Sequence, residues 1–227
     1  MSRSTIKSFN IGGPCHPTKH YMSPLLSCQA RVKEMIEEKF YFILHVPPQS
    51  GKTTFLHELT DAINSQGQMY ALYCSLELCQ GLTDVAQAMT RIAVAINRAL
   101  RMSTVDSLAS LAFPVDGLPN SDPSEKIFNS LNRLCVNLDQ DLVVFFDEVD
   151  YLTDAPLITF LQQIRSGYND RFDSPASKFP RSMALVGLRD IRDYALETGV
   201  GQNSTGAIKF SHIKKEALTL PNFTQDE

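Results

Sequence analysis

The sequence contains no apolar stretch that approaches the roughly 20 residues needed to span a bilayer. Its first ten residues, MSRSTIKSFN, also lack the apolar run of a signal peptide. The five cysteines are scattered and form no paired C-x₂-C motif. That spacing favours reduced thiols over a disulfide framework or a zinc site. From these absences we expect a cytoplasmic protein that does not associate with membranes.

Charge of one sign is not in excess either. The formal net charge is −4 over 227 residues, so nothing in the overall balance indicates a nucleic-acid surface. A local basic patch remains compatible with an acidic chain. Hydrophobic residues make up 43% and charged residues 20%, which is ordinary globular usage and excludes a disordered chain. The length fits one domain with at most a small appendage.

Short apolar runs alternate with amphipathic segments along the chain. The runs are typical of strands buried on both faces of a parallel sheet. The expected strands are 40–46, 69–76, 142–146, 182–188 and 217–220. The expected helices are 25–39, 51–65, 83–101, 122–138 and 154–167. This alternation predicts an α/β fold with right-handed crossovers and helices on both faces of the sheet.

One helix start is well marked. In Asp122-Pro123-Ser124-Glu125, Asp122 is expected to accept backbone N–H bonds as the cap. Pro123 fits the first turn, and Glu125 is placed to reach back to the cap. We therefore expect a helix that begins directly after Asp122.

A candidate phosphate-binding loop stands between the first expected strand and the next helix. Backbone N–H groups of such a loop, together with the helix dipole, favour a bound phosphate. Lys52 is expected to reach the β- and γ-phosphates, the Thr53 hydroxyl to ligate Mg²⁺, and Gly51 to let the backbone approach closely. The candidate nucleotide-binding residues of this loop are Pro48, Gln49, Ser50, Gly51, Lys52, Thr53 and Thr54.

The loop departs from the usual pattern G-x-x-x-x-G-K-[ST] at its first glycine. That position is Val46 here, and valine does not adopt a positive φ cheaply. We expect the chain to enter the loop differently, through Pro47 and Pro48. The alternative interpretation is a lysine at an ordinary strand–helix turn.

The apolar run 142–146 ends in two acids, Asp147 and Glu148. On a buried parallel strand these acids emerge at the carboxyl edge, beside the phosphate loop. Asp147 is expected to hold the Mg²⁺ shell, and Glu148 to act as the general base that activates water. The alternative is a solvated strand end with capping acids. For Asp150 we favour a cap on the following helix over a role in tuning Glu148.

Three segments, HVPPQSGKTT (45–54), FFDEVD (145–150) and SMALVGLRD (182–190), resemble AAA+-type P-loop ATPases. The resemblance covers nearly the whole chain and looks closest to bacterial AAA-like ATP-binding proteins near the origin-binding and STAND/NACHT-type ATPases. It implies a three-layer AAA+ core over 25–220 with strand order 5-1-4-3-2.

The same resemblance implies roles for further residues. Arg189 would be the sensor-1 residue that contacts the γ-phosphate, with a salt bridge to Asp190 as the alternative. The N-terminal segment 1–24 would lie near the adenine, with His20 or Tyr21 stacking on the base.

AAA+ proteins carry a helical lid with a sensor-2 arginine after the fifth strand. Residues 221–227 stand where that lid or a linker would begin, so we expect slow hydrolysis without a lid or an oligomer. A neighbouring subunit can supply an arginine finger. The candidates, each with a solvated surface arginine as the alternative, are Arg165, Arg171, Arg181 and Arg192.

The sequence therefore predicts an ATP-binding protein and Mg²⁺-dependent ATP hydrolase that acts as a nucleotide-driven switch or AAA+ subunit. Its expected partners are ATP and ADP, further copies of itself, and a protein or DNA molecule. A nucleotide-dependent binding or signalling module with little turnover is the first alternative. A P-loop small-molecule kinase is the second, and the Asp147–Glu148 pair disfavours it because that pair activates water.

Overall fold

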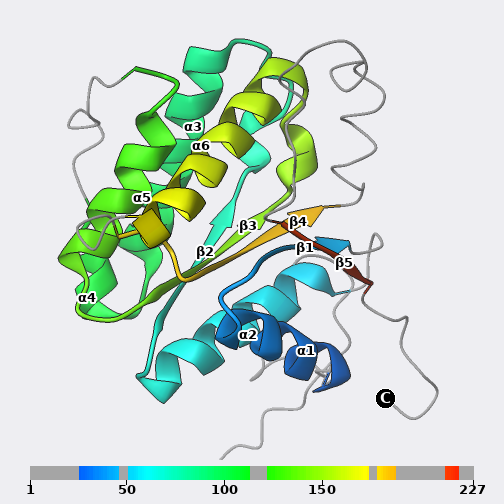
Figure 1. Ribbon diagram of the computed structural model, residues 1–227, viewed down its shortest axis with the longest axis vertical. Helices are drawn as coiled ribbons and strands as arrows, with labels where there is room; N and C mark the ends of the chain where they lie inside the picture. Colours follow the sequence, from blue (N-terminus) through cyan, green and yellow to red (C-terminus); the bar gives the residue numbers. More distant parts are fainter. Residues whose placement is uncertain (1–25, 46–50, 113–121, 174–177, 188–212, 220–227) are drawn as a thin grey trace, which may run out of the picture.

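The computed structural model describes residues 26–45, 51–112, 122–173, 178–187 and 213–219. Within these ranges the strands form one parallel sheet with helices on both faces (Figure 1). The strands are β1 (Tyr41–His45), β2 (Tyr70–Ser75), β3 (Leu142–Asp147), β4 (Ser182–Gly187) and β5 (Ile213–Thr219). The expected α/β fold with a parallel sheet is confirmed.

The strands lie in the order β2-β3-β4-β1-β5. As expected from the order 1-4-3-2, β4 lies between β1 and β3, and β3 lies between β4 and β2. The last strand begins at Ile213 and ends at Thr219, earlier than the expected range 217–220. Register pairs such as His45 with Gly187 and Ser75 with Asp147 bring the carboxyl ends of the strands to one edge.

Two hydrophobic clusters lie on opposite faces of the sheet. Helices α1 (Leu26–Glu37) and α2 (Lys52–Gln66) cover one face (Figure 1). The helices on the other face are α3 (Val85–Met102), α5 (Lys126–Asn137) and α6 (Asp154–Asp173). Along β3, Val143 and Phe145 pack toward α1 and α2, whereas Val144 and Phe146 pack toward the other helices. Because both faces are covered, the strand is apolar at every one of these positions.

Helix α3 confirms the amphipathic pattern predicted from the sequence. Met89, Ile92 and Ile96 are fully buried at 0% exposure. The helix begins after Asp84, whose carboxylate accepts a hydrogen bond from the backbone N–H of Gln87 at 2.8 Å. The apolar stripe therefore faces the sheet, and its polar complement faces solvent.

Helix α5 corrects the expected capping by Asp122. The helix begins at Lys126, and Asp122 instead accepts bonds from the backbone N–H and the hydroxyl of Ser124, at 2.8 and 2.7 Å, in the turn before it. Glu125 precedes the first helical residue and makes no side-chain cap bond. The local sequence thus forms a turn of its own, which delays the helix by one turn.

A residue far away in the sequence caps α5 in place of Asp122. Gln163 of α6 is buried, with 3% exposure, and its Oε1 accepts from the backbone N–H groups of Ile127 and Phe128 at 2.8 and 3.2 Å. Its Nε2 donates to the carbonyl of Pro123 at 3.0 Å. The first orphan amides of α5 are therefore satisfied by tertiary contact.

Two short helical segments complete the described elements around the sheet. The segment η1 (Glu77–Cys79) follows β2, and η3 (Val149–Tyr151) follows β3. A four-residue helix, α4 (Asp106–Ala109), lies in the range 103–121 that the sequence predicted as a loop or partly ordered. Both 3₁₀ segments lie at the carboxyl edge, next to the two acids at the end of β3.

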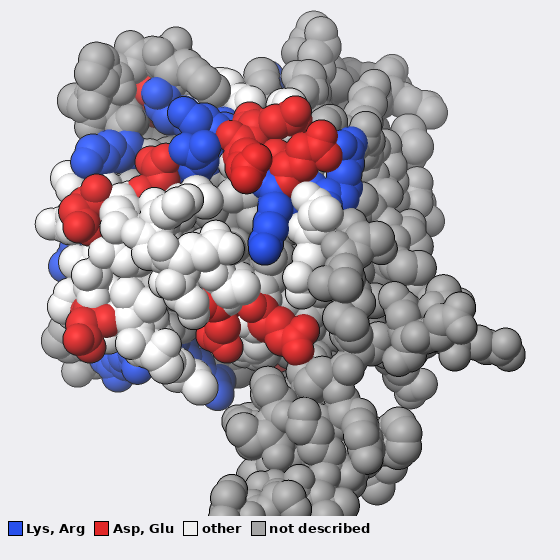
Figure 2. All heavy atoms as spheres, turned by 90° about the horizontal axis from the view of Figure 1, so that it is seen from below, with Lys and Arg blue, Asp and Glu red and all other residues white. Residues whose placement is uncertain are grey.

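The described surface mixes charges of both signs. On the face seen from below, basic and acidic side chains lie side by side (Figure 2). No helix in the described ranges is long and apolar enough to cross a membrane.

Candidate functional site

Gly51 sets the start of α2 at the carboxyl edge of the sheet. Its φ of 77° and ψ of 15° place it in the left-handed region, which glycine adopts without steric cost. Its carbonyl accepts the first helical bond from the N–H of Phe55 at 2.9 Å. Lys52 and Thr53 consequently occupy the first turn, where unpaired N–H groups and the helix dipole favour an anion.

Lys52 and Asp147 form a buried ion pair across this edge. The Nζ of Lys52 lies 2.7 Å from Oδ1 of Asp147, and their side chains are 15% and 0% exposed. Thr53 Oγ1 lies 3.4 Å from Oδ2 of the same carboxylate. The structure thus brings together residues from the two sequence motifs that the prediction linked. A carboxylate this deeply buried requires such a partner.

Asp147 has two further donors that the sequence did not indicate. The hydroxyl of Tyr73 lies 3.0 Å from Oδ2, and the backbone N–H of Glu148 donates to Oδ1 at 2.8 Å. Burial, with the nearby Asp147 charge, raises the pKa of Tyr73, so its hydroxyl stays protonated and donates. Tyr73 belongs to β2, which we had assigned only a structural role.

Glu148 is held in place by the end of β2. Its backbone adopts φ 61° and ψ 37°, a left-handed conformation that costs energy for a residue other than glycine. The Ser75 hydroxyl lies 2.8 Å from Oε2 of Glu148 and accepts from the backbone N–H of Glu77 at 3.2 Å. Because the Glu77 N–H occupies an acceptor position on the hydroxyl, the Ser75 proton points to Glu148.

The surroundings of Glu148 act on its pKa in both directions. Burial raises the pKa above the usual range for glutamate, and the charges of Asp147 and Glu77 add to that effect. The hydrogen bond from Ser75 and the charge of Lys52 act to lower it. A raised pKa brings a carboxylate closer to the range in which a general base works at neutral pH.

Asp150 does not cap α6, which corrects the role we favoured from the sequence. Its Oδ1 is buried and has no hydrogen-bond partner within the described ranges. A Cβ added at Gly187 would lie 2.7 Å from that oxygen, so the glycine leaves room for the carboxylate. Asp150 therefore faces the end of β4 rather than the start of α6.

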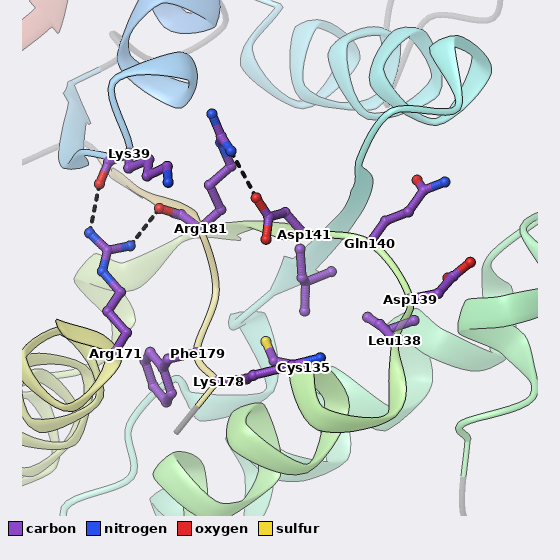
Figure 3. Close-up of a pocket in the computed structure, with 11 residues that line it drawn as sticks. Lys39, Cys135, Leu138, Asp139, Gln140, Asp141, Arg171, Lys178, Phe179 and Arg181 are labelled. Atoms are coloured by element: carbon purple, nitrogen blue, oxygen red, sulfur yellow. Dashed lines mark hydrogen bonds and ion pairs between the residues drawn. The ribbon is translucent and has the colours of Figure 1, made fainter. Parts of the chain in front are cut away.

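Two of the four candidate finger arginines lie at the opposite, amino edge of the sheet (Figure 3). Arg171 donates to the carbonyls of Lys39 and Arg181 at 2.8 and 2.6 Å. Arg181 forms an ion pair with Asp141 at 2.8 Å. Both guanidinium groups are engaged within the fold, so neither is a solvated surface arginine nor a finger for a neighbour.

These arginines line a cavity of about 360 Å³ beside Phe179 and Cys135. In Figure 3 the cavity lies among the amino ends of β3 and β4 and the end of α5. It is separated from Lys52 and Asp147 by the length of the sheet. Burial raises the pKa of Cys135 to about 12, so its thiol is unreactive at neutral pH. This cavity is not part of the carboxyl-edge site.

Several predicted site residues lie outside the described ranges and stay predictions. The loop residues are Pro48, Gln49 and Ser50, and the candidate sensor residue is Arg189. His20 and Tyr21, with the segments 1–24 and 221–227, also lie outside them. Thr54 follows Thr53 in the first turn of α2.

The donor set fits a hard divalent cation. The Thr53 hydroxyl and the Asp147 carboxylate are oxygen ligands and lie 3.4 Å apart. Mg²⁺ prefers such ligands and commonly takes the rest from phosphates and water. Fold and site together define a three-layer α/β protein whose lysine-bearing helix N-terminus faces an acidic strand end.

The fold is similar to that of the Aeropyrum pernix ORC2 protein, solved as ADPNP–ADP complexes. That likeness has a TM-score of 0.52 and 16% sequence identity, covering 91% of this chain and 51% of the other. Two further solved structures are the A. pernix ORC1 protein in complex with DNA and Cdc6p from Pyrobaculum aerophilum. Their TM-scores are 0.48 and 0.49, with 16% and 15% identity; they cover 90% and 89% of this chain and 47% and 45% of theirs.

The chain spans about half the length of these solved structures. No protein-family model matches the sequence, and no curated protein is found to match it. At 16% identity, the likeness to the ORC2 protein establishes the fold and carries no activity with it.

Proposed function

We propose that this chain binds Mg-ATP at Lys52, Thr53 and Asp147 and hydrolyses it slowly to ADP and phosphate. The carrying observation is the 2.7 Å approach of Lys52, at the start of α2, to the buried Asp147 at the end of β3. A helix N-terminus with a lysine receives phosphates, and a carboxylate opposite it receives the accompanying cation. In this proposal the chain is an AAA+-type core that acts as a nucleotide-driven switch.

Phosphate binding changes the partner of Lys52. In the nucleotide-free arrangement its ammonium neutralises Asp147. The β- and γ-phosphates attract that ammonium away, which leaves Asp147 without its counter-charge in a buried position. Mg²⁺, when bound, neutralises charge on the phosphates. Asp147 and Thr53 hold the cation, so nucleotide and metal each favour binding of the other.

Glu148 is the proposed general base. Its carboxylate leaves Ser75 and accepts a proton from the attacking water, and positioning supplies most of the catalysis of phosphoryl transfer. The proposal extends to residues outside the described ranges. Pro48, Gln49 and Ser50 belong to the phosphate loop, Arg189 contacts the γ-phosphate, and His20 or Tyr21 stacks on the adenine.

A second function, a nucleotide-dependent binding module with little turnover, is favoured by one observation. Both catalytic side chains are occupied in the resting structure, Lys52 by Asp147 and Glu148 by Ser75. A chain of this kind would need a partner to release Glu148. Self-assembly, or binding to DNA or to another protein, supplies such a partner in this version of the proposal. The ADPNP–ADP complexes of the similar ORC2 protein support nucleotide binding in both versions.

The experiment is thermal unfolding of the chain with and without Mg-ATP. A ligand at about 100 times its dissociation constant adds roughly 2.7 kcal/mol. For a domain of this size the expected rise in Tm is about 5 to 10 °C. Lys52→Ala should abolish the ligand-induced rise, whereas Lys178→Ala, an exposed lysine near the opposite edge, should retain it.

Absence of any rise at millimolar Mg-ATP in the parent chain would contradict the proposal. Given a rise, phosphate release by the parent and by Glu148→Gln separates the two versions. Measurable release that is lost in Glu148→Gln supports hydrolysis. Binding without release, by the chain alone and with added DNA, supports the binding module.

A further inference from the structure

We infer that Tyr73 is a positioning residue of the metal subsite, whose hydroxyl orients the Asp147 carboxylate so that Oδ2 faces Thr53. This inference rests on the proposed function. It deepens that function by assigning a β2 side chain to the binding of the cation. The phenol does not touch the nucleotide, so its effect is exerted through Asp147.

The sheet register places Tyr73 within reach of Asp147. On neighbouring strands Ser75 pairs with Asp147, and Tyr73 pairs with Phe145 two residues earlier. Side chains two residues apart on a strand point to the same face. Tyr73 therefore lies on the α2 face, below Asp147, and extends its hydroxyl 3.0 Å from Oδ2.

The two oxygens of Asp147 have unequal support. Oδ1 receives Lys52 Nζ at 2.7 Å and the N–H of Glu148 at 2.8 Å. Oδ2 receives Tyr73 at 3.0 Å and only a long contact from Thr53 at 3.4 Å. Tyr73 is therefore the principal donor to the oxygen that faces Thr53.

The contribution of Tyr73 grows when phosphate binds. Lys52 then leaves Oδ1, and the remaining short donors are the N–H of Glu148 and the hydroxyl of Tyr73. The terminal torsion of an aspartate is broad, so a carboxylate keeps one orientation only where donors hold both oxygens. One donor on each oxygen, from two different strands, holds that plane.

His57 in turn holds the ring of Tyr73. The two ring centroids are 4.3 Å apart and the planes are tilted by 42°. His57 lies on α2, four residues after Thr53, so the helix that supplies the hydroxyl ligand also packs against the phenol. Such outer groups commonly change metal affinity by about 10-fold or more when they are removed.

The test compares nucleotide affinity in Mg²⁺ and in EDTA, using a fluorescent ATP analogue. In wild type, Mg²⁺ should strengthen binding. In Tyr73→Phe we expect the affinity in EDTA to stay unchanged, and the gain from Mg²⁺ to fall about 10-fold. Half-saturation in a Mg²⁺ titration at fixed analogue should move to higher concentration by a similar factor. A purely structural role would weaken binding equally in both conditions.

Tyr70→Phe is the matched control. Tyr70 lies on the same strand and donates to an aspartate, Asp139, at 2.9 Å, but at the far end of the sheet. It should leave the gain from Mg²⁺ unchanged. His57→Ala should give a smaller loss than Tyr73→Phe, and it tests the same support without altering the phenol.

Equal weakening with and without Mg²⁺ in Tyr73→Phe, or no change in either, overturns the inference. A wild-type chain that binds the analogue in neither condition overturns the proposed function as well. These two failures are distinguishable, because the first requires normal binding by the wild type.

Discussion

The Ser75 hydroxyl lies 2.8 Å from Oε2 of Glu148, at the point where β2 and β3 leave the sheet. The donor and the base come from adjacent strands that are joined by nearly 70 residues of chain. The contact ties the conformation of the strand end after β2 to the availability of the proposed base. Removal of the hydroxyl should therefore change how Glu148 titrates.

Ser75→Ala should move the acid limb of the pH–activity profile to higher pH. The Ser75 bond lowers the pKa of Glu148, so its loss raises that pKa further. A general base works in its ionised form, and activity is lost as pH falls through its pKa. The measurement is kcat/KM for ATP from about pH 5 to 9. Ser65→Ala, an exposed serine on α2, is the control, and an unmoved limb or a shift to lower pH would contradict the expectation.

Gln163→Leu should destabilise the fold by about 1 to 3 kcal/mol, because the first amides of α5 lose their buried acceptor. Gln162→Leu changes the same residue type at the exposed neighbouring position of α6 and should alter stability by no more than about 0.5 kcal/mol. Urea unfolding of both variants provides the comparison. Equal stability of the two would mean that Gln163 does not cap α5.

Gly187→Ala should destabilise the chain by about 1 to 3 kcal/mol, because its Cβ would meet the buried Oδ1 of Asp150 at 2.7 Å. The loss should be smaller in the background of Asp150→Ala, which removes that oxygen. Gly67→Ala serves as the comparison: its φ is +66° and no atom lies within 4 Å, so its cost is backbone strain alone. A double-mutant cycle in urea measures the coupling, and strict additivity of the Gly187 and Asp150 changes would count against the contact.

Arg171→Lys should destabilise the fold by about 2 to 3 kcal/mol while leaving nucleotide affinity unchanged. The guanidinium donates to the carbonyls of Lys39 and Arg181 and lies 4.1 Å from the ring centroid of Tyr168. A single ammonium cannot reproduce those planar contacts. Arg165→Lys, on the same helix, should be nearly neutral. Normal stability with reduced ATP turnover would reverse this assignment and restore Arg171 as a finger.

The sheet and the two acidic and basic ends of the site were predictable from the sequence. Uninterrupted apolar runs such as 142–146 identify strands covered on both faces, and parallel strands present their carboxyl ends at one edge. A lysine after one strand and an acid after another must then approach one another. That argument needed no knowledge of which strands were neighbours.

The support of the site was not predictable in the same way. Tyr73 and Ser75 reach Asp147 and Glu148 only because β2 and β3 pair in one particular register. The available signal was modest: two hydroxyl groups, two residues apart, at the carboxyl end of a strand. Without the register, each looked like an ordinary strand residue.

Local capping rules failed where distant contacts were stronger. Asp122 satisfies Ser124 in its own turn, and the start of α5 is capped by Gln163 from another helix. Arg171 likewise looked like a surface residue because its carbonyl partners lie in other elements. Such roles depend on tertiary packing, which the period of a helix does not encode.

The strand order also has a consequence for synthesis of the chain. β1 and β2 follow one another along the polypeptide, yet β3 and β4 lie between them in the sheet. Neither early strand has its neighbour until the ribosome has passed residue 142 for β2 and residue 182 for β1. The nascent chain therefore carries two apolar strands with open edges through most of translation. Such edges attract other chains, so folding yield in the cell should depend on chaperones that bind the growing polypeptide before β4 emerges.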